Sequence, residues 1–126
     1  FPLANLSPDF RAWLAILAIR SGDLPAARQY LSSIDRLGQP DGIKLLCAMA
    51  AVMLAVVEAS PAEKATVFAD AREDLWVAAQ ACAPNDVPPG AARVYQEVVK
   101  RIHAEVGSWS SRFWALRQQI RPWVRR

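Results

Sequence analysis

The stretch "RSGDLPAARQYL", residues Arg20–Leu31, ends one helical pattern and starts another within two residues. Gly22 can adopt the left-handed conformation that ends a helix, and the side chain of Asp23 can cap the N-terminus of the next one. Ala27 and Leu31 are four positions apart, so they share one face of that second helix. The stretch therefore predicts two helices joined by a tight turn.

On both sides of this turn, capping and helix-breaking residues divide the chain into six helical segments. Capping residues and proline mark the starts of these segments, and glycine and proline mark their ends. No stretch alternates apolar and polar residues for long enough to form a strand. We expect an all-α domain of six helices in three antiparallel hairpins, arranged as a repeat stack or a compact bundle. The predicted helices cover about 8–21, 24–37, 42–59, 61–82, 91–106 and 108–121. The three hairpins span 8–37, 42–83 and 90–121, and a basic tail spans 122–126.

The third segment contains "LLCAMAAVMLAVV", 13 apolar residues in a row at 45–57. A bilayer span needs about 20 such residues, so we expect a central helix of the bundle. The next segment begins Ser60-Pro61, and Glu63 stands where it would close a capping box, which predicts a helix start.

Length and composition describe a single folded domain. The chain has 126 residues, of which 53% are hydrophobic and 21% charged, typical of a globular protein. It begins Phe1-Pro2 rather than with methionine, which is typical of a processed chain or of a piece of a longer protein. We expect a cytoplasmic location.

Two cysteines, Cys47 and Cys82, lie within apolar helical runs. Free cysteine behaves as a small hydrophobic residue, so we expect two buried reduced thiols. The alternative, in an exported chain, is a disulfide bridge between the two helices.

The first hairpin resembles the tetratricopeptide repeat, whose signature is W-x2-L-G-x2-Y in one helix and A-x3-F followed by proline in the next. The resemblance covers one unit of about 34 residues, with Arg11 in the tryptophan slot, and the other hairpins match only loosely. A "GDL-x-A-A" turn is also typical of helical-repeat regions in bacterial regulators. The matching residues are Leu14, Ala15, Ala18, Gly22, Asp23, Ala27, Leu31 and, one residue past its slot, Pro40.

The resemblance implies a non-enzymatic module that binds a helix or peptide of another protein. Bacterial secretion chaperones, scaffolds and regulatory or assembly subunits have this size and pattern. On the first helix, the face that does not pack on the second would be either covered by the rest of the domain or open as a groove for a partner helix. The candidate groove residues are Ala12, Ile16, Ile19 and Arg20.

The C-terminal segment supports a different hypothesis. Ten basic and twelve acidic residues precede Ser108, whereas five arginines and no acid follow it. Exposed arginine and tryptophan suit protein interfaces, nucleic acid or an anionic membrane surface, and a solvated basic end is the simpler alternative. The candidate contacts are Arg112, Trp114, Arg117, Arg121, Arg125 and Arg126.

No pattern of residues points to catalysis. His103 is the only histidine and there is no C-x-x-C pair, so the sequence provides no metal-ligand set. The five glycines form no nucleotide-binding loop. We therefore predict no catalytic, cofactor or metal site. A structural domain that forms a homo-oligomer through its apolar faces is a further alternative.

Overall fold

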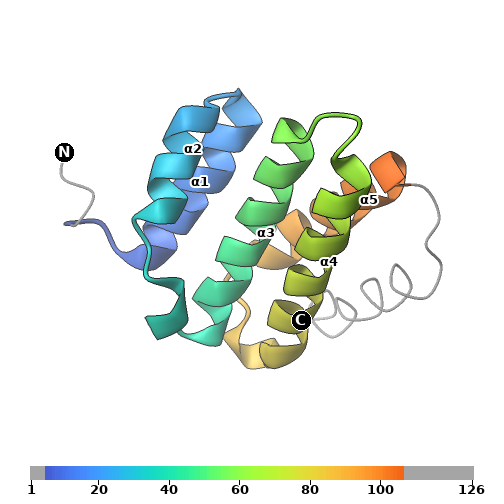
Figure 1. Ribbon diagram of the computed structural model, residues 1–126. Coiled ribbons are helices and arrows are strands. Elements are labelled where there is room, and N and C mark those ends of the chain that lie inside the picture. Colours follow the sequence, from blue (N-terminus) through green and yellow to red (C-terminus); the bar gives the residue numbers. More distant parts are fainter. Residues whose placement is uncertain (1–4, 107–126) are drawn as a thin grey trace.

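A computed structural model describes residues 5–106, with Lys64, Ala65, Phe68, Arg72 and residues 102–106 described by their backbone alone. All the secondary structure of this part of the chain is helical, with no strand, which confirms the all-α prediction (Figure 1). The predicted sixth helix and the basic tail lie outside the described residues. The elements are α1 (Pro8–Ser21), α2 (Leu24–Ser32), the 3-10 helix η2 (Arg36–Gly38), α3 (Asp41–Glu58), α4 (Lys64–Ala81), the 3-10 helix η3 (Pro84–Asp86) and α5 (Ala91–Val106).

The turn between α1 and α2 forms as predicted. Gly22 has φ 85°, in the left-handed region, and its N–H donates to the carbonyl of Ile19 at 3.1 Å. Asp23 closes the turn from both sides: its N–H donates to the carbonyl of Ala18 at 2.8 Å, and its carboxylate accepts the N–H of Ala26 at 3.2 Å. The first two helices are thus fixed by local hydrogen bonds.

Helix α2 ends at Ser32 instead of continuing to Leu37 as predicted. The hydroxyl of Ser33 donates to the carbonyl of Tyr30 at 2.6 Å, and serine hydroxyls that bond nearby backbone weaken a helix end. Arg11 of α1 then donates to the carbonyl of Ser33 at 2.6 Å. The arginine in the tryptophan slot therefore ties α1 to the end of α2.

Helix α4 begins at Lys64, and the predicted capping box does not form. The carbonyl of Ser60 accepts the N–H of Glu63 at 3.0 Å, which makes a turn ahead of the helix. Glu63 itself takes the N-cap position with helical backbone angles and no side-chain cap hydrogen bond. The predicted start was wrong by about one helical turn.

Helix α3 is the centre of the molecule, as its apolar sequence predicts. It packs against α1, α2, α4 and α5, and it lies between the α1–α2 pair and α4 (Figure 1). Within residues 5–106, no helix is long and apolar enough to cross a bilayer. The buried residues of α3 are Gly42, Leu45, Leu46, Cys47, Ala48, Met49, Ala50, Val52, Met53 and Val56.

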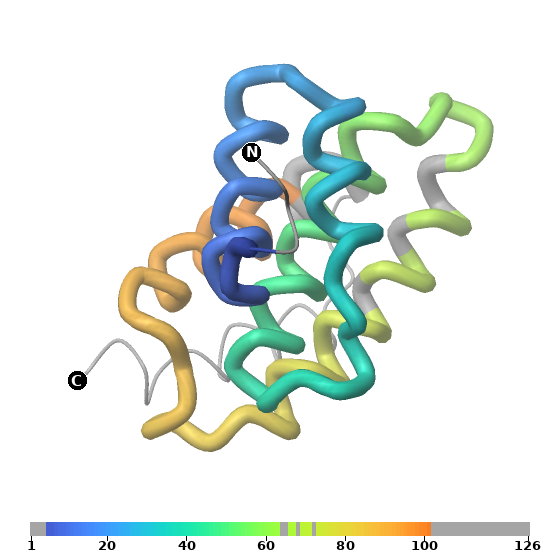
Figure 2. The backbone as a smooth tube through the Cα atoms, turned by 90° about the vertical axis from the view of Figure 1, so that its left-hand side faces the viewer, coloured from blue at the N-terminus to red at the C-terminus, as the bar shows by residue number. Residues whose placement is uncertain are grey.

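Helix α5 packs against α3 and α4, lies behind them in the view of Figure 1, and reaches one side of α1 through side-chain contacts. At its start, a Cβ placed on Gly90 would lie 3.7 Å from the ring of Trp13. Two turns later, Glu97 accepts a hydrogen bond from Arg20 at 2.6 Å. Tyr95, between these contacts, is completely buried. The two contacts are seven residues apart along both segments, so α5 has the same general direction as α1 (Figure 2).

Candidate protein-binding surface

The groove predicted on α1 is part of the core. Ala12 and Ile16 are completely buried and Ile19 is 7% exposed. Ile16 shares one stripe of the helix with Trp13 and Arg20, and both of these contact α5 or the turn before it. Arg20 is exposed but pairs with Glu97. The prediction of an open groove at these residues is therefore wrong, because α3 and α5 of the same chain cover this side.

The open side of α1 is the one opposite the core. Phe10 is 50% exposed and Leu17 is 55% exposed, and the half-buried Trp13 and Leu14 lie between them. These four residues follow the i, i+3, i+4, i+7 spacing of a single helix face. We call Phe10, Trp13, Leu14 and Leu17 the open face of α1.

The open face is unusual because the middle of α1, from Ala12 to Ile19, is apolar all round. Its buried residues occupy the opposite face, and helices that are apolar all round are normally enclosed by protein. Here α1 is enclosed on only part of its circumference, so an apolar strip two turns long meets solvent. Such strips mark interaction sites more often than scattered exposed residues do. The buried residues of α1 are Ala12, Ala15, Ile16, Ala18 and Ile19.

Two charged residues border the open face at its two ends. Asp9 and Arg20 are eleven positions apart, close to three full turns, so they lie on the same flank of the helix. A hydrogen bond from Ser7 lowers the pKa of Asp9, with burial acting against it. Asp9 also stands in the first turn of α1 and Arg20 in the last, where each charge complements the helix dipole.

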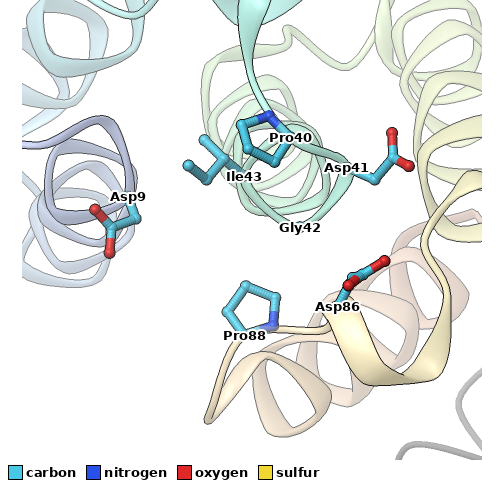
Figure 3. A pocket seen from close by; sticks show the side chains of 7 residues that line it. All are labelled: Asp9, Pro40, Asp41, Gly42, Ile43, Asp86 and Pro88. Carbon is cyan, nitrogen blue, oxygen red and sulfur yellow. The ribbon is translucent and has the colours of Figure 1, made fainter.

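An acidic hollow of about 500 Å³ lies where the N-termini of α1 and α3 meet the segment after η3 (Figure 3). The carboxylates of Asp41 and Asp86 lie on one side of it, and the carboxylate of Asp9 points away from both (Figure 3). Among the residues described, no group of acids, cysteines or histidines could hold a metal ion. The lining residues are Asp9, Pro40, Asp41, Gly42, Ile43, Asp86 and Pro88.

A second hollow, of about 380 Å³, lies between η2, the start of α3 and the end of α4. It contains two exposed apolar side chains, Leu37 at 89% and Val77 at 58%. Arg36 and Asp74, which also line it, form an ion pair at 2.9 Å. Its apolar residues come from different elements and are separated by charges, so it offers a less continuous apolar surface than α1 does.

The two cysteines are buried and free, as the sequence predicts. Burial raises the pKa of the Cys47 thiol, with Arg36 acting against the shift. Burial, helped by the charges of Asp86 and Asp41, raises the pKa of Cys82 to about 11. The thiolate is the reactive form of cysteine, so neither residue has the properties of a nucleophile.

The remaining candidates from the sequence fall outside the described side chains. His103 belongs to α5, but its side chain is among those not described. The tail candidates Arg112, Trp114, Arg117, Arg121, Arg125 and Arg126 lie beyond residue 106.

Comparisons of the chain with protein-family models, curated proteins and solved structures gave no match. The tetratricopeptide resemblance therefore stays a prediction.

Proposed function

We propose that this chain is a non-enzymatic protein-interaction module that binds a helix or peptide of a partner on the open face of α1. The observation that carries the proposal is the half-exposed pair Phe10 and Leu17, with Trp13 and Leu14 between them on one face. A partner helix with apolar residues at the same spacing would cover all four side chains.

The packing order of the helices supports a scaffold of stacked hairpins. Helix α1 packs on α2, α3 packs on α4, and α3 also contacts both α1 and α5. First helices that pack on one another, with second helices behind them, are the arrangement of helical-hairpin repeats, from which this chain departs in that α5 also reaches α1 through the Arg20–Glu97 pair. In such a stack, α1 is the terminal first helix, and an outer face that no other helix within residues 5–106 covers is available for another protein.

The apolar area of this face favours weak, reversible binding. Full burial of a phenylalanine or leucine side chain contributes about 1.5–3 kcal/mol, and Phe10 and Leu17 are already half-buried. Part of the gain is offset by the lost freedom of the two molecules. We therefore expect an interaction that depends on every apolar residue of the open face.

Replacing Leu17 by glutamate tests the proposal. Proteins from the native source are captured on the immobilised chain, on Leu17→Glu and on the matched control Leu37→Glu, and are quantified by mass spectrometry. Leu37 is also an exposed leucine but belongs to η2. A buried, unpaired charge is costly, so we expect Leu17→Glu to lose the specific partners at least about tenfold while Leu37→Glu keeps them.

We expect both variants to be folded, because both positions are more than half exposed. Circular dichroism and urea unfolding check this. Equal capture by the wild-type chain, Leu17→Glu and Leu37→Glu would show that the open face binds no protein and would overturn the proposal.

A further inference from the structure

We propose that the occupant of the open face of α1 is α1 of a second copy of this chain, packed antiparallel about a twofold axis. This inference rests on the proposed function and names its partner. When two copies pack antiparallel, the open face complements itself in the spacing of its apolar residues and in charge.

The apolar residues match each other across such an axis. Phe10 and Leu17 are equally far from the midpoint between Trp13 and Leu14. An antiparallel partner that places Trp13 against Leu14 of the second copy therefore also places Phe10 against Leu17. A twofold contact of this kind uses the same patch on both subunits, so one face provides both halves of the interface.

The charges select the antiparallel orientation. Asp9 and Arg20 lie on the same flank of α1 at opposite ends, and an antiparallel twofold keeps the two flanks on the same side of the interface. Arg20 of the second copy then lies about two residues, or ~3 Å along the helix, beyond Asp9, within reach of a long arginine side chain, and the pair occurs twice. In a parallel twofold pair the two flanks lie on opposite sides of the interface, so Asp9 and Arg20 find no opposite charge across it. The guanidinium of Arg20 has five N–H donors and can bind a second carboxylate while it keeps Glu97. The carboxylate of Asp9 points away from Asp41 and Asp86 (Figure 3), so the acidic hollow does not hold it.

The charge balance of the open face argues against a strongly basic or acidic partner. One acid and one base border its apolar strip, and the two offset each other. The acidic hollow has an unbalanced charge, but within the residues described it has no donor set for a metal. A second copy of this chain is the partner that can place an opposite charge near both Asp9 and Arg20.

The predicted dimer is weak and reversible. A helix of 14 residues is about 21 Å long, and one such helix pair buries less surface than a standard stable interface. Sedimentation equilibrium over a range of concentrations measures it directly. We expect the weight-average mass to rise from that of one chain to that of two.

Charge reversal tests the orientation. In Asp9→Arg the dimer would face arginine with arginine, and in Arg20→Asp it would face aspartate with aspartate. We expect each variant alone to weaken the dimer about tenfold or more. An equimolar mixture of the two variants restores both attractive pairs, so we expect a heterodimer of wild-type strength in the mixture. A purely structural effect of either change would not be rescued by mixing.

The matched control is Arg36→Asp, which breaks an exposed ion pair of similar length between η2 and α4, outside the open face, and should leave the dimer unchanged. A chain that remains monomeric up to about 1 mM, or a dimer that neither charge reversal weakens, would overturn this inference. If the wild-type chain is monomeric but Leu17→Glu still loses captured proteins, only the inference fails. If Leu17→Glu changes neither capture nor sedimentation, the proposed function fails as well.

Discussion

Gly42, in the first turn of α3, lies where two segments of the chain approach too closely for any side chain. A Cβ at this position would lie 2.4 Å from the carbonyl oxygen of Asp86 and 3.3 Å from Cδ of Pro88. The nearer contact is backbone, so a rotamer change cannot relieve it. The close approach fixes the loop that carries Asp86 against the start of α3.

We predict that Gly42→Ala lowers the free energy of unfolding by about 1–3 kcal/mol, because the added methyl group forces the loop away from α3. Urea unfolding measures the change. The control is Gly38→Ala, whose Cβ would meet the flexible carboxylate of Asp35 at 3.2 Å. The control should change stability by less than about 0.5 kcal/mol. Equal losses in both variants would contradict the steric explanation.

The role of Gly42 could not be predicted from the sequence. A glycine after proline and aspartate at a helix start is a common local pattern, and local rules give it no further meaning. Its constraint comes from Asp86 and Pro88, which are distant in the chain and which α4 brings back to the start of α3.

At the scale of the element, α2 depends on its cap more than the longer helices do. It has nine residues, and helices this short are marginal without tertiary contacts and capping. Among its residues only Ala27 is fully buried. The side chain of Asp23 satisfies a backbone N–H that α2 cannot satisfy itself.

We predict that Asp23→Ala destabilises the chain by about 1 kcal/mol through loss of this cap. The matched control is Asp35→Ala, since Asp35 occupies the N-cap position of η2 without a side-chain cap hydrogen bond. Thermal unfolding compares the two variants. The explanation fails if Asp35→Ala costs as much stability as Asp23→Ala.

The elements were predictable where local chemistry decides them. The bounds of α1 and α5, the turn at Gly22 and the central position of α3 follow from capping, glycine geometry and apolar pattern. The end of α2 and the start of α4 were not predictable, because hydrogen bonds of local turns at Ser33 and Glu63 compete with the hydrogen bonds of a continuing helix. The sequence also shows that α1 is apolar on more than one side. It does not show which side α5 covers.

At the scale of the whole molecule, a buried thiol and a buried phenol make the free energy of unfolding depend on pH in the alkaline range. Burial, Asp86 and Asp41 raise the pKa of Cys82 from 9.0 to about 11, and burial raises the pKa of Tyr95 above its usual 10.0. The folded chain therefore holds these protons more tightly than the unfolded chain does. The resulting stabilisation is complete below pH 9 and is lost as the pH rises toward 11 and beyond.

We predict that the urea midpoint falls steadily above pH 9 and that Cys82→Ala makes this fall shallower between pH 9 and about 11. The variant is also less stable at neutral pH, because a buried side chain is shortened, so the slope with pH is the quantity to compare. Parallel curves for the wild-type chain and Cys82→Ala would show that Cys82 does not contribute.

The contact between α1 and α5 also has a consequence for synthesis. Arg20 and Glu97 are 77 positions apart, and a ribosome adds about 5–20 residues per second, so α1 waits about 4–15 s for its neighbour. During that interval Arg20 lacks the carboxylate with which it pairs in the finished chain. The side of α1 that the sequence suggested as a groove is thus covered in two stages, first by α3 and later by α5.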